Sequence, residues 1–221
     1  MGESAWIERA MKIHVLPAGP IQTNAYVLTA PERGEALLID APQGVWPAVK
    51  SILEREGCRL VELWLTHGHF DHIQGVEEVL AATGVTCFGH EADREMMASP
   101  AVVEARLGFE LGLQPVHPGG WFTDGETRQI LGQNVEVRAV PGHCPGSVLF
   151  YFPTESVAFS GDAIFAGSVG RTDFEGGSFP VLEKSIREKI YTLPEDTRLY
   201  PGHGPATTVG VEKRGNPFVR A

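Results

Sequence analysis

Three histidines and one aspartate are crowded into the segment LTHGHFDHIQG, which spans residues 65–75. They are His67, His69, Asp71 and His72, and they follow a short apolar run at residues 61–65. His67 and His69 are two residues apart, so in an extended backbone both rings lie on the same side and can reach one cation. Asp71 and His72 come where a helix is expected to begin, and they would face a neighbouring position. Imidazole and carboxylate groups are ligands of zinc, iron and manganese, so the segment predicts a metal site.

Three further potential ligands follow predicted strands elsewhere in the chain. His143 and His203 each end a Pro-Gly-His tripeptide placed directly after a strand, and Asp162 follows a strand and Gly161. Four strands therefore each deliver a potential ligand at their carboxyl end, where the sites of open α/β sheets collect. Five histidines and two aspartates are enough for two cations, with one carboxylate bridging them.

The elements that must position these residues alternate between strands and helices. Strands are predicted at residues 13–16, 26–29, 36–39, 61–65, 85–88, 128–131, 135–140, 147–152, 157–159 and 198–200. Helices are predicted at residues 47–56, 73–82 and 181–192, with a further helical stretch at 91–113 that is broken near Pro100. This order predicts two sheets packed together with helices outside them. We expect residues 1–10 to be an N-terminal extension and residues 11–221 to form a single domain.

Composition limits the class of partner. The formal net charge is −10, which argues against nucleic acid because phosphate contacts need clustered Lys and Arg. No signal peptide and no apolar run approaching the ~18 residues of a membrane span is evident. The three cysteines form no CxxC pair and suit a reducing compartment. We therefore expect a cytoplasmic protein, monomeric or homodimeric, that acts on a small molecule and binds neither nucleic acid nor a membrane.

The motifs THGHFDH, PGH at 141–143, SGD at 160–162 and PGH at 201–203 resemble the metallo-β-lactamase superfamily in order and spacing. The resemblance implies an α/β fold, a four-layer αββα sandwich with the metals at one edge of the two sheets. It also implies the following ligand sets: His67, His69 and His143 for a first site, Asp71, His72 and His203 for a second site, and Asp162 as the bridge.

Two longer segments, GDAIFAGSVGRTDFEGG and PGHGPATTVGVEKRGNPF, resemble the glyoxalase II-like hydrolases, in particular their short bacterial branch. Full-length members add a C-terminal helical domain that contacts glutathione, and we expect this domain to be missing here, because the sequence stops at Ala221. Two tyrosines of their glutathione site are replaced here by Asp173 and Pro205, whereas Arg171 stands where they carry a lysine. The resemblance therefore implies a substrate-binding role for Arg171, with a structural ion pair as the alternative.

The activity predicted from these residues is hydrolysis of a thioester such as S-lactoylglutathione. Two divalent cations, zinc in preference to iron or manganese, would hold a bridging hydroxide, and Asp71 would act as a catalytic group by orienting it. One alternative is a persulfide dioxygenase with a single iron on His67, His143 and Asp162. Others are a lactonase or another ester hydrolase on the same centre, and a non-catalytic metal-binding protein.

Three further features allow two interpretations each. Cys144 follows His143 directly and is interpreted as a packed thiol in preference to a nucleophile. The helical stretch at 91–113 is a candidate lid, although its Met96-Met97 pair is typical of core packing. Trp121 and Phe122 suit either the wall of a cleft or the core of the sandwich.

Overall fold

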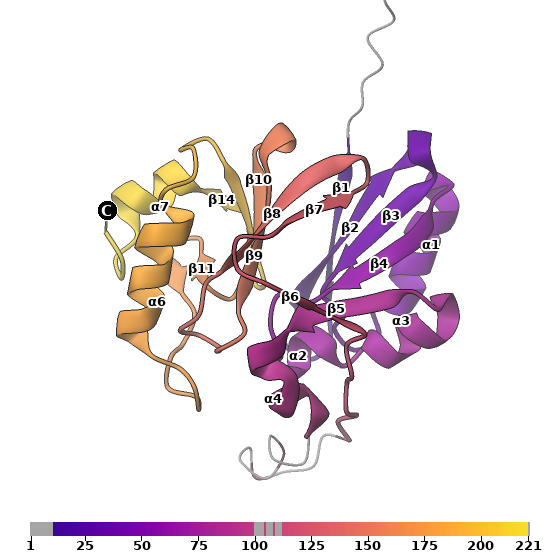
Figure 1. Cartoon of the computed structure of the whole chain (residues 1–221), viewed down its shortest axis with the longest axis horizontal. Coiled ribbons are helices and arrows are strands. Elements are labelled where there is room, and N and C mark those ends of the chain that lie inside the picture. Colours follow the sequence, from indigo (N-terminus) through magenta and orange to yellow (C-terminus); the bar gives the residue numbers. More distant parts are fainter. Residues whose placement is uncertain (1–10, 100–103, 105–107, 109–111, 221) are drawn as a thin grey trace, which may run out of the picture.

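The computed structural model describes residues 11–99, 104, 108 and 112–220. Within these residues, two six-stranded mixed sheets lie face to face with helices on the outer side of each (Figure 1). The predicted α/β class and its αββα order of layers are confirmed. The extension expected at residues 1–10 lies outside the described residues.

The first sheet keeps the order of the chain. Its strands are β1 (Lys12–Ala18), β2 (Thr23–Ala30), β3 (Glu35–Ile39), β4 (Arg59–Trp64), β5 (Thr86–His90) and β6 (Gly120–Phe122). The pairs β1–β2 and β2–β3 are antiparallel, and the pairs from β3 to β6 are parallel. The carboxyl ends of β3 and β4 therefore lie at the same edge.

The second sheet has the order β14-β13-β10-β9-β8-β7. Its strands are β7 (Thr127–Ile130), β8 (Gln133–Ala139), β9 (Val148–Phe152), β10 (Val157–Gly161), β13 (Arg198–Pro201) and β14 (Thr207–Thr208). β10 and β13 are parallel, so their carboxyl ends also share one edge. A small separate hairpin is formed by β11 (Ile164–Phe165) and β12 (Ser168–Val169).

The core follows the two-residue period of the strands. In β3, Ala36 and Leu38 face the helices outside the first sheet, whereas Leu37 and Ile39 face the second sheet. In β9, Leu149 belongs to the cluster under the outer helices of the second sheet, whose other members include Leu182 and Val209. Successive side chains point to opposite faces of a strand, so continuously apolar strands such as these must be covered on both faces.

The helices that cover the first sheet are α1 (Trp46–Glu56) and α3 (Val76–Thr83), with the short α2 (Phe70–Ile73) between them in sequence. The predicted proline near the start and glycine after the end of α1 are both observed, and Gly57 has a left-handed backbone. η2 (Glu91–Asp93) and α4 (Arg94–Ala98) follow β5. The remainder of the candidate lid lies largely outside the described residues.

The second sheet is covered by α6 (Phe179–Ser185), its π-helical continuation η4 (Ile186–Ile190) and α7 (Val209–Gly215), on the left of Figure 1. Two single 3-10 turns connect neighbouring strands: η1 (Pro31–Arg33) joins β2 to β3, and η3 (Pro153–Glu155) joins β9 to β10. Among the described helices, none combines the length and the apolar character required to cross a membrane.

Two predicted helices differ from the observed ones. The helix expected at 73–82 is divided at Gly75, whose amide donates to Ala41 O at 2.7 Å. A Cβ at Gly75 would lie 2.4 Å from Pro42 O, so close backbone packing against the loop after β3 determines where α3 begins. The helix expected at 181–192 begins earlier, at Phe179, with Pro180 in its first turn. The short strands β6, β11, β12 and β14 were not predicted, because two or three residues give no periodic signal.

Candidate metal centre

All seven potential ligands meet at the edge where β4, β8, β10 and β13 end. Their ligand atoms form three groups, each with all atoms within 4.8 Å of one another. The groups are His67–His69–His143, His67–His72–Asp162 and Asp71–His72–His203. The first group and the third have the composition of the two sites that the sequence resemblance implies. The second group contains Asp162 together with His67 from the first group and His72 from the third.

Asp162 contacts members of the first and third groups, His67–His69–His143 and Asp71–His72–His203, which are called the outer groups below. Its Oδ1 lies 3.4 Å from His72 Nε2, and its Oδ2 lies 3.5 Å from His203 Nε2 and 3.6 Å from His143 Nε2. On one side of it, His69 Nδ1 lies 2.8 Å from His143 Nε2. On the other side, Asp71 Oδ2 lies 3.2 Å from His203 Nε2. The carboxylate of Asp162 therefore occupies the position that a bridging ligand would need.

Three of these ligand atoms are buried and lack a hydrogen bond. They are His67 Nε2, His72 Nε2 and Asp162 Oδ1. An unsatisfied buried polar atom costs about 1–3 kcal/mol, so three within one cluster indicate that another group completes their bonding. Imidazole nitrogens and carboxylate oxygens are the donors preferred by zinc, iron and manganese. The residues present therefore fit divalent cations.

The opposite ring nitrogens of three histidines are fixed by hydrogen bonds. His143 Nδ1 donates to Arg171 O at 2.8 Å, and His72 Nδ1 donates to Asp40 Oδ2 at 2.7 Å. Thr66 Oγ1 donates to Asp40, so it is free to accept from His67 Nδ1 at 3.0 Å. Each Nε2 therefore faces the cluster and is the ring nitrogen available to a cation.

Asp40 is a functional residue that the sequence analysis missed. It follows β3, is 1 % exposed, and has a left-handed backbone with φ of 58°. Its Oδ1 accepts from the Thr66 amide at 2.7 Å, and its Oδ2 accepts from the Thr66 hydroxyl and from His72. Asp40 thus orients the start of the histidine-rich loop. A signal was present in the sequence, because Asp40 ends a buried strand in the same way as Asp162.

The first residues of β2 hold two other parts of the cluster. Thr23 Oγ1 donates to Asp71 Oδ2 at 2.7 Å. Asn24 Nδ2 donates to Pro201 O at 3.0 Å and to Gly204 O at 2.9 Å, on both sides of His203. The contacts of Asn24 cross between the two sheets, so the position of His203 depends on the packing of the sheets.

Charge within the cluster favours a cation. Burial lowers the pKa of His72, but Asp71, Asp162 and Asp40 outweigh that effect and raise it well above the usual value. Burial would raise the pKa of Asp71, but His72 and His203 hold it below the ordinary range. Against the same effect of burial, His72 likewise lowers the pKa of Asp162, so Asp71 and Asp162 remain ionised beside it. On the other side, burial and the neighbouring His143 lower the pKa of His69 to about 3, so its ring is neutral and available as a ligand.

A cleft of about 600 Å³ opens onto the cluster. Much of its wall is apolar: Ile21, Phe70, Met96, Phe165, Val169 and Phe174. Ligands from both outer groups, among them His69, His143, Asp71 and His203, line it as well. A small molecule in this cleft would contact both halves of the cluster.

Arg171 lines the same cleft but is already paired. Its guanidinium binds Asp173 through two contacts of 2.7 and 2.6 Å and stacks on Phe174, with 3.9 Å to the ring centroid. Both charged side chains are exposed, 58 % for Arg171 and 68 % for Asp173. The ion-pair interpretation of Arg171 therefore has a partner in the structure. Its carbonyl has a second role, which was not predicted, in orienting His143.

The remaining ambiguous residues also have definite surroundings. Cys144 is fully buried, its thiol donates to Asp93 Oδ2 at 3.0 Å, and burial raises its pKa well above the ordinary value. This environment favours a packed, protonated thiol. Phe122 is 3 % exposed and packs between the sheets, whereas Met97 is buried and Met96 faces the cleft.

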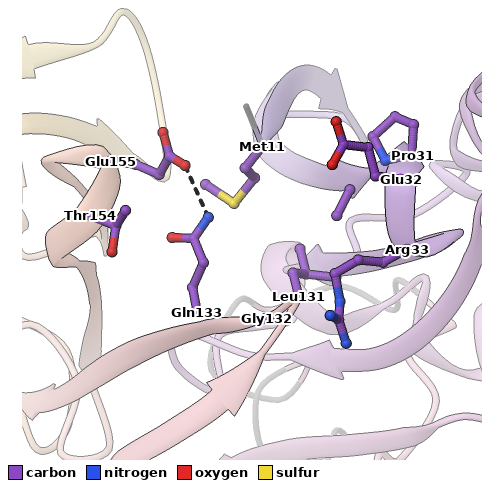
Figure 2. A pocket seen from close by; sticks show the side chains of 10 residues that line it. Met11, Pro31, Glu32, Arg33, Leu131, Gly132, Gln133, Thr154 and Glu155 are labelled. Carbon is purple, nitrogen blue, oxygen red and sulfur yellow. Dashed lines mark hydrogen bonds between the residues drawn. The ribbon is translucent and has the colours of Figure 1, made fainter. Parts of the chain in front are cut away.

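A second cavity of about 410 Å³ lies at the opposite end of the sandwich (Figure 2). Ala30, at the end of β2, lines it, whereas Thr23 at the start of β2 contacts Asp71 of the ligand cluster. Gln133 donates to Glu155 across this cavity at 2.9 Å. None of the predicted site residues lines it.

The fold and the cluster agree with a family model. The model of the metallo-β-lactamase superfamily matches residues 18–203. The chain therefore belongs to the metallo-β-lactamase superfamily.

Individual relatives cover nearly the whole chain. It is 35 % identical over 212 residues to the probable metallo-hydrolase YqgX of Bacillus subtilis, which covers 95 % of this chain and 98 % of that protein. It is 34 % identical over 213 residues to the hydroxyacylglutathione hydrolase GloC of Haemophilus influenzae. The alignment covers 96 % of this chain and 99 % of that protein.

Solved structures show the same similarity. The BLEG-1 B3 metallo-β-lactamase has a TM-score of 0.85 and 39 % identity, with 95 % of this chain and 100 % of that chain covered. TTHA1623 in a di-iron-bound form has a TM-score of 0.81 and 32 % identity, with 93 % of this chain and 100 % of that chain covered.

Proposed function

We propose that the protein is a dinuclear metal-dependent hydrolase that cleaves a thioester such as S-lactoylglutathione. The observation that carries the proposal is the arrangement of seven ligand residues in two outer groups joined through Asp162, with three buried ligand atoms that lack hydrogen bonds. A single cation would leave one outer group unused. Two cations would engage both.

Divalent cations in such a centre supply Lewis acidity and lower the pKa of a bound water enough for it to act as a nucleophile near neutral pH. The chain contributes the geometry. His67, His69 and His143 would hold one cation, Asp71, His72 and His203 the other, and Asp162 would lie between them. Because the pKa of Asp71 is held low, its carboxylate is a weak proton acceptor and acts mainly by orienting the nucleophile.

The substrate class is supported by the cleft and by one relative. The apolar wall formed by residues such as Phe165 and Phe174 suits an acyl chain or the alkyl part of a thiol carrier. The hydroxyacylglutathione hydrolase GloC shares 34 % identity over almost its full length. Hydrolysis at two cations requires no side-chain nucleophile, which agrees with the buried position of Cys144.

A panel of substrates tests the proposal. The purified protein, with its metal content measured, is offered S-lactoylglutathione, simple acyl thioesters, a lactone and a β-lactam, and oxygen uptake is followed with glutathione persulfide. We expect release of free thiol from at least one thioester at the highest kcat/KM of the panel. If oxygen uptake or lactam opening is faster while both cation positions are filled, the thioesterase assignment is wrong.

A further inference from the structure

Asp93 is a buried carboxylate beside the cluster that belongs to none of the three ligand groups. It lies between β5 and α4 and is 1 % exposed. Its Oδ2 accepts from the Gly68 amide at 2.8 Å and from the Cys144 thiol at 3.0 Å, and its Oδ1 accepts from the Gly146 amide at 2.6 Å. Three donors therefore converge on one carboxylate.

All three donors belong to the loops that carry the three-histidine group. Gly68 lies between His67 and His69, in the loop after β4 of the first sheet. Gly146 lies three residues after His143, in the loop between β8 and β9 of the second sheet. Through its two oxygens, Asp93 thus connects the ligand loop of one sheet to that of the other.

Asp93 is packed tightly against the backbone of both glycines. A Cβ at Gly68 would lie 2.9 Å from Asp93 Cβ, and a Cβ at Gly146 would lie 2.5 Å from Asp93 Cγ. Both separations are shorter than ordinary van der Waals contact. The backbone of each loop is therefore packed directly against Asp93, and a displacement of Asp93 toward either loop must move that loop.

The other outer group is held by different residues. Asp40 orients His72, Thr23 donates to Asp71, and Asn24 holds the backbone on both sides of His203. No hydrogen bond described for Asp93 reaches Asp71, His72 or His203 themselves. Loss of Asp93 should therefore affect the two halves of the centre unequally.

We propose that Asp93 is a positioning residue that fixes the spacing of the two loops and thereby the affinity of the His67–His69–His143 group for its cation. The inference rests on the proposed function, because it takes these histidines as one half of a two-cation centre. Residues that orient metal ligands commonly change metal affinity by about tenfold to a hundredfold when mutated.

The test is a cation titration of the metal-free Asp93→Asn variant. Asparagine keeps the shape of the side chain, but its NH2 group cannot accept a hydrogen bond, so the bond from either Gly68 or Gly146 is lost. We expect two cobalt or zinc equivalents in the wild type. In Asp93→Asn we expect one dissociation constant to rise by about tenfold to a hundredfold and the other to stay unchanged. The spectrum of the cobalt-loaded variant should resemble that of His69→Ala and differ from that of His203→Ala.

Glu212→Gln is the matched control. Glu212 is also 1 % exposed and also accepts from three donors, Gly167 N, Thr207 Oγ1 and Asn216 Nδ2. Its removal should lower the unfolding temperature and leave both cation affinities within about threefold of wild type, because only indirect effects remain. If Asp93→Asn is too unstable to purify, Gly146→Ala serves instead, because its added methyl group would displace Asp93.

The outcomes are separable. Wild-type affinity at both positions in Asp93→Asn, or an equal loss at both, would overturn the positioning role and leave the proposed function intact. If the wild-type protein binds fewer than two cations, the proposed function itself fails.

Discussion

A methyl group added at Gly202 is predicted to disable the metal centre, and its effect can be estimated from the structure. A Cβ at this position would lie 2.0 Å from Asp162 Oδ1 and 2.6 Å from His72 Cε1. Reaching ordinary van der Waals contact requires the carboxylate oxygen to move by about 1.4 Å. Metal–ligand distances tolerate only about 0.2 Å. In Gly202→Ala, Asp162 therefore cannot keep its place between the two outer groups.

We expect Gly202→Ala to weaken cation binding at least about a hundredfold, which exceeds the usual effect of moving a residue outside the ligand set. Gly202 is not in the left-handed region, so alanine adds little backbone strain. The metal-free protein should consequently remain folded. Isothermal titration with zinc measures the cation affinity, and thermal unfolding of the metal-free protein measures its stability.

Gly204→Ala in the same loop is the control, because alanine there strains the backbone but meets no neighbouring atom, whereas at Gly202 it collides with Asp162 without backbone strain. Gly204 has φ of 73°, but a Cβ there would meet no heavy atom within 4 Å. Backbone strain of about 1 kcal/mol should lower the unfolding temperature by about 2–4 °C. Both cations should still bind. Equal cation affinities for Gly202→Ala and Gly204→Ala would refute the reasoning, because steric exclusion at Asp162 would then not matter.

Three other predictions concern charge and the thiol. Asp173→Asn frees the Arg171 guanidinium, so KM for anionic S-lactoylglutathione should fall about two- to fivefold, as expected for an exposed ion pair. An equal change with a neutral acyl thioester would argue against contact between Arg171 and substrate. Cys144→Ala should keep at least about a third of wild-type kcat, since no step needs the thiol. A large loss with both cations bound would restore the nucleophile interpretation. Since the pKa of His72 is raised in the metal-free protein, a proton competes for Nε2, and cation affinity should fall by up to about tenfold per unit as pH decreases below that pKa. A pH-independent dissociation constant would contradict this.

The sequence predicted the ligand loops better than the contacts that hold them. The histidine-rich loop, the two PGH tripeptides and Gly161-Asp162 all follow strands, and parallel strands bring such ends to one edge. The order of the strands is enough to expect these residues at one edge, and the structure brings all seven of them together. The order of the strands could not identify their hydrogen-bond partners.

Asp93 illustrates what could not be predicted. It lies in the polar segment HEADREMM, which has the composition of an exposed turn. Its burial arises because β5 places it against Gly68 from the first sheet and Gly146 from the second. Contacts between residues so far apart in the chain have no local periodicity. The division of the predicted helix at Gly75 has the same origin, since it depends on the packing of Pro42.

The requirement for two cations is tested most directly by titrating the metal-free protein with zinc while the initial rate of thioester hydrolysis is recorded. We predict little activity at one equivalent and full activity at two, because the nucleophile and the substrate carbonyl need both halves of the centre. Full activity at one equivalent, unchanged by a second, would contradict a dinuclear mechanism.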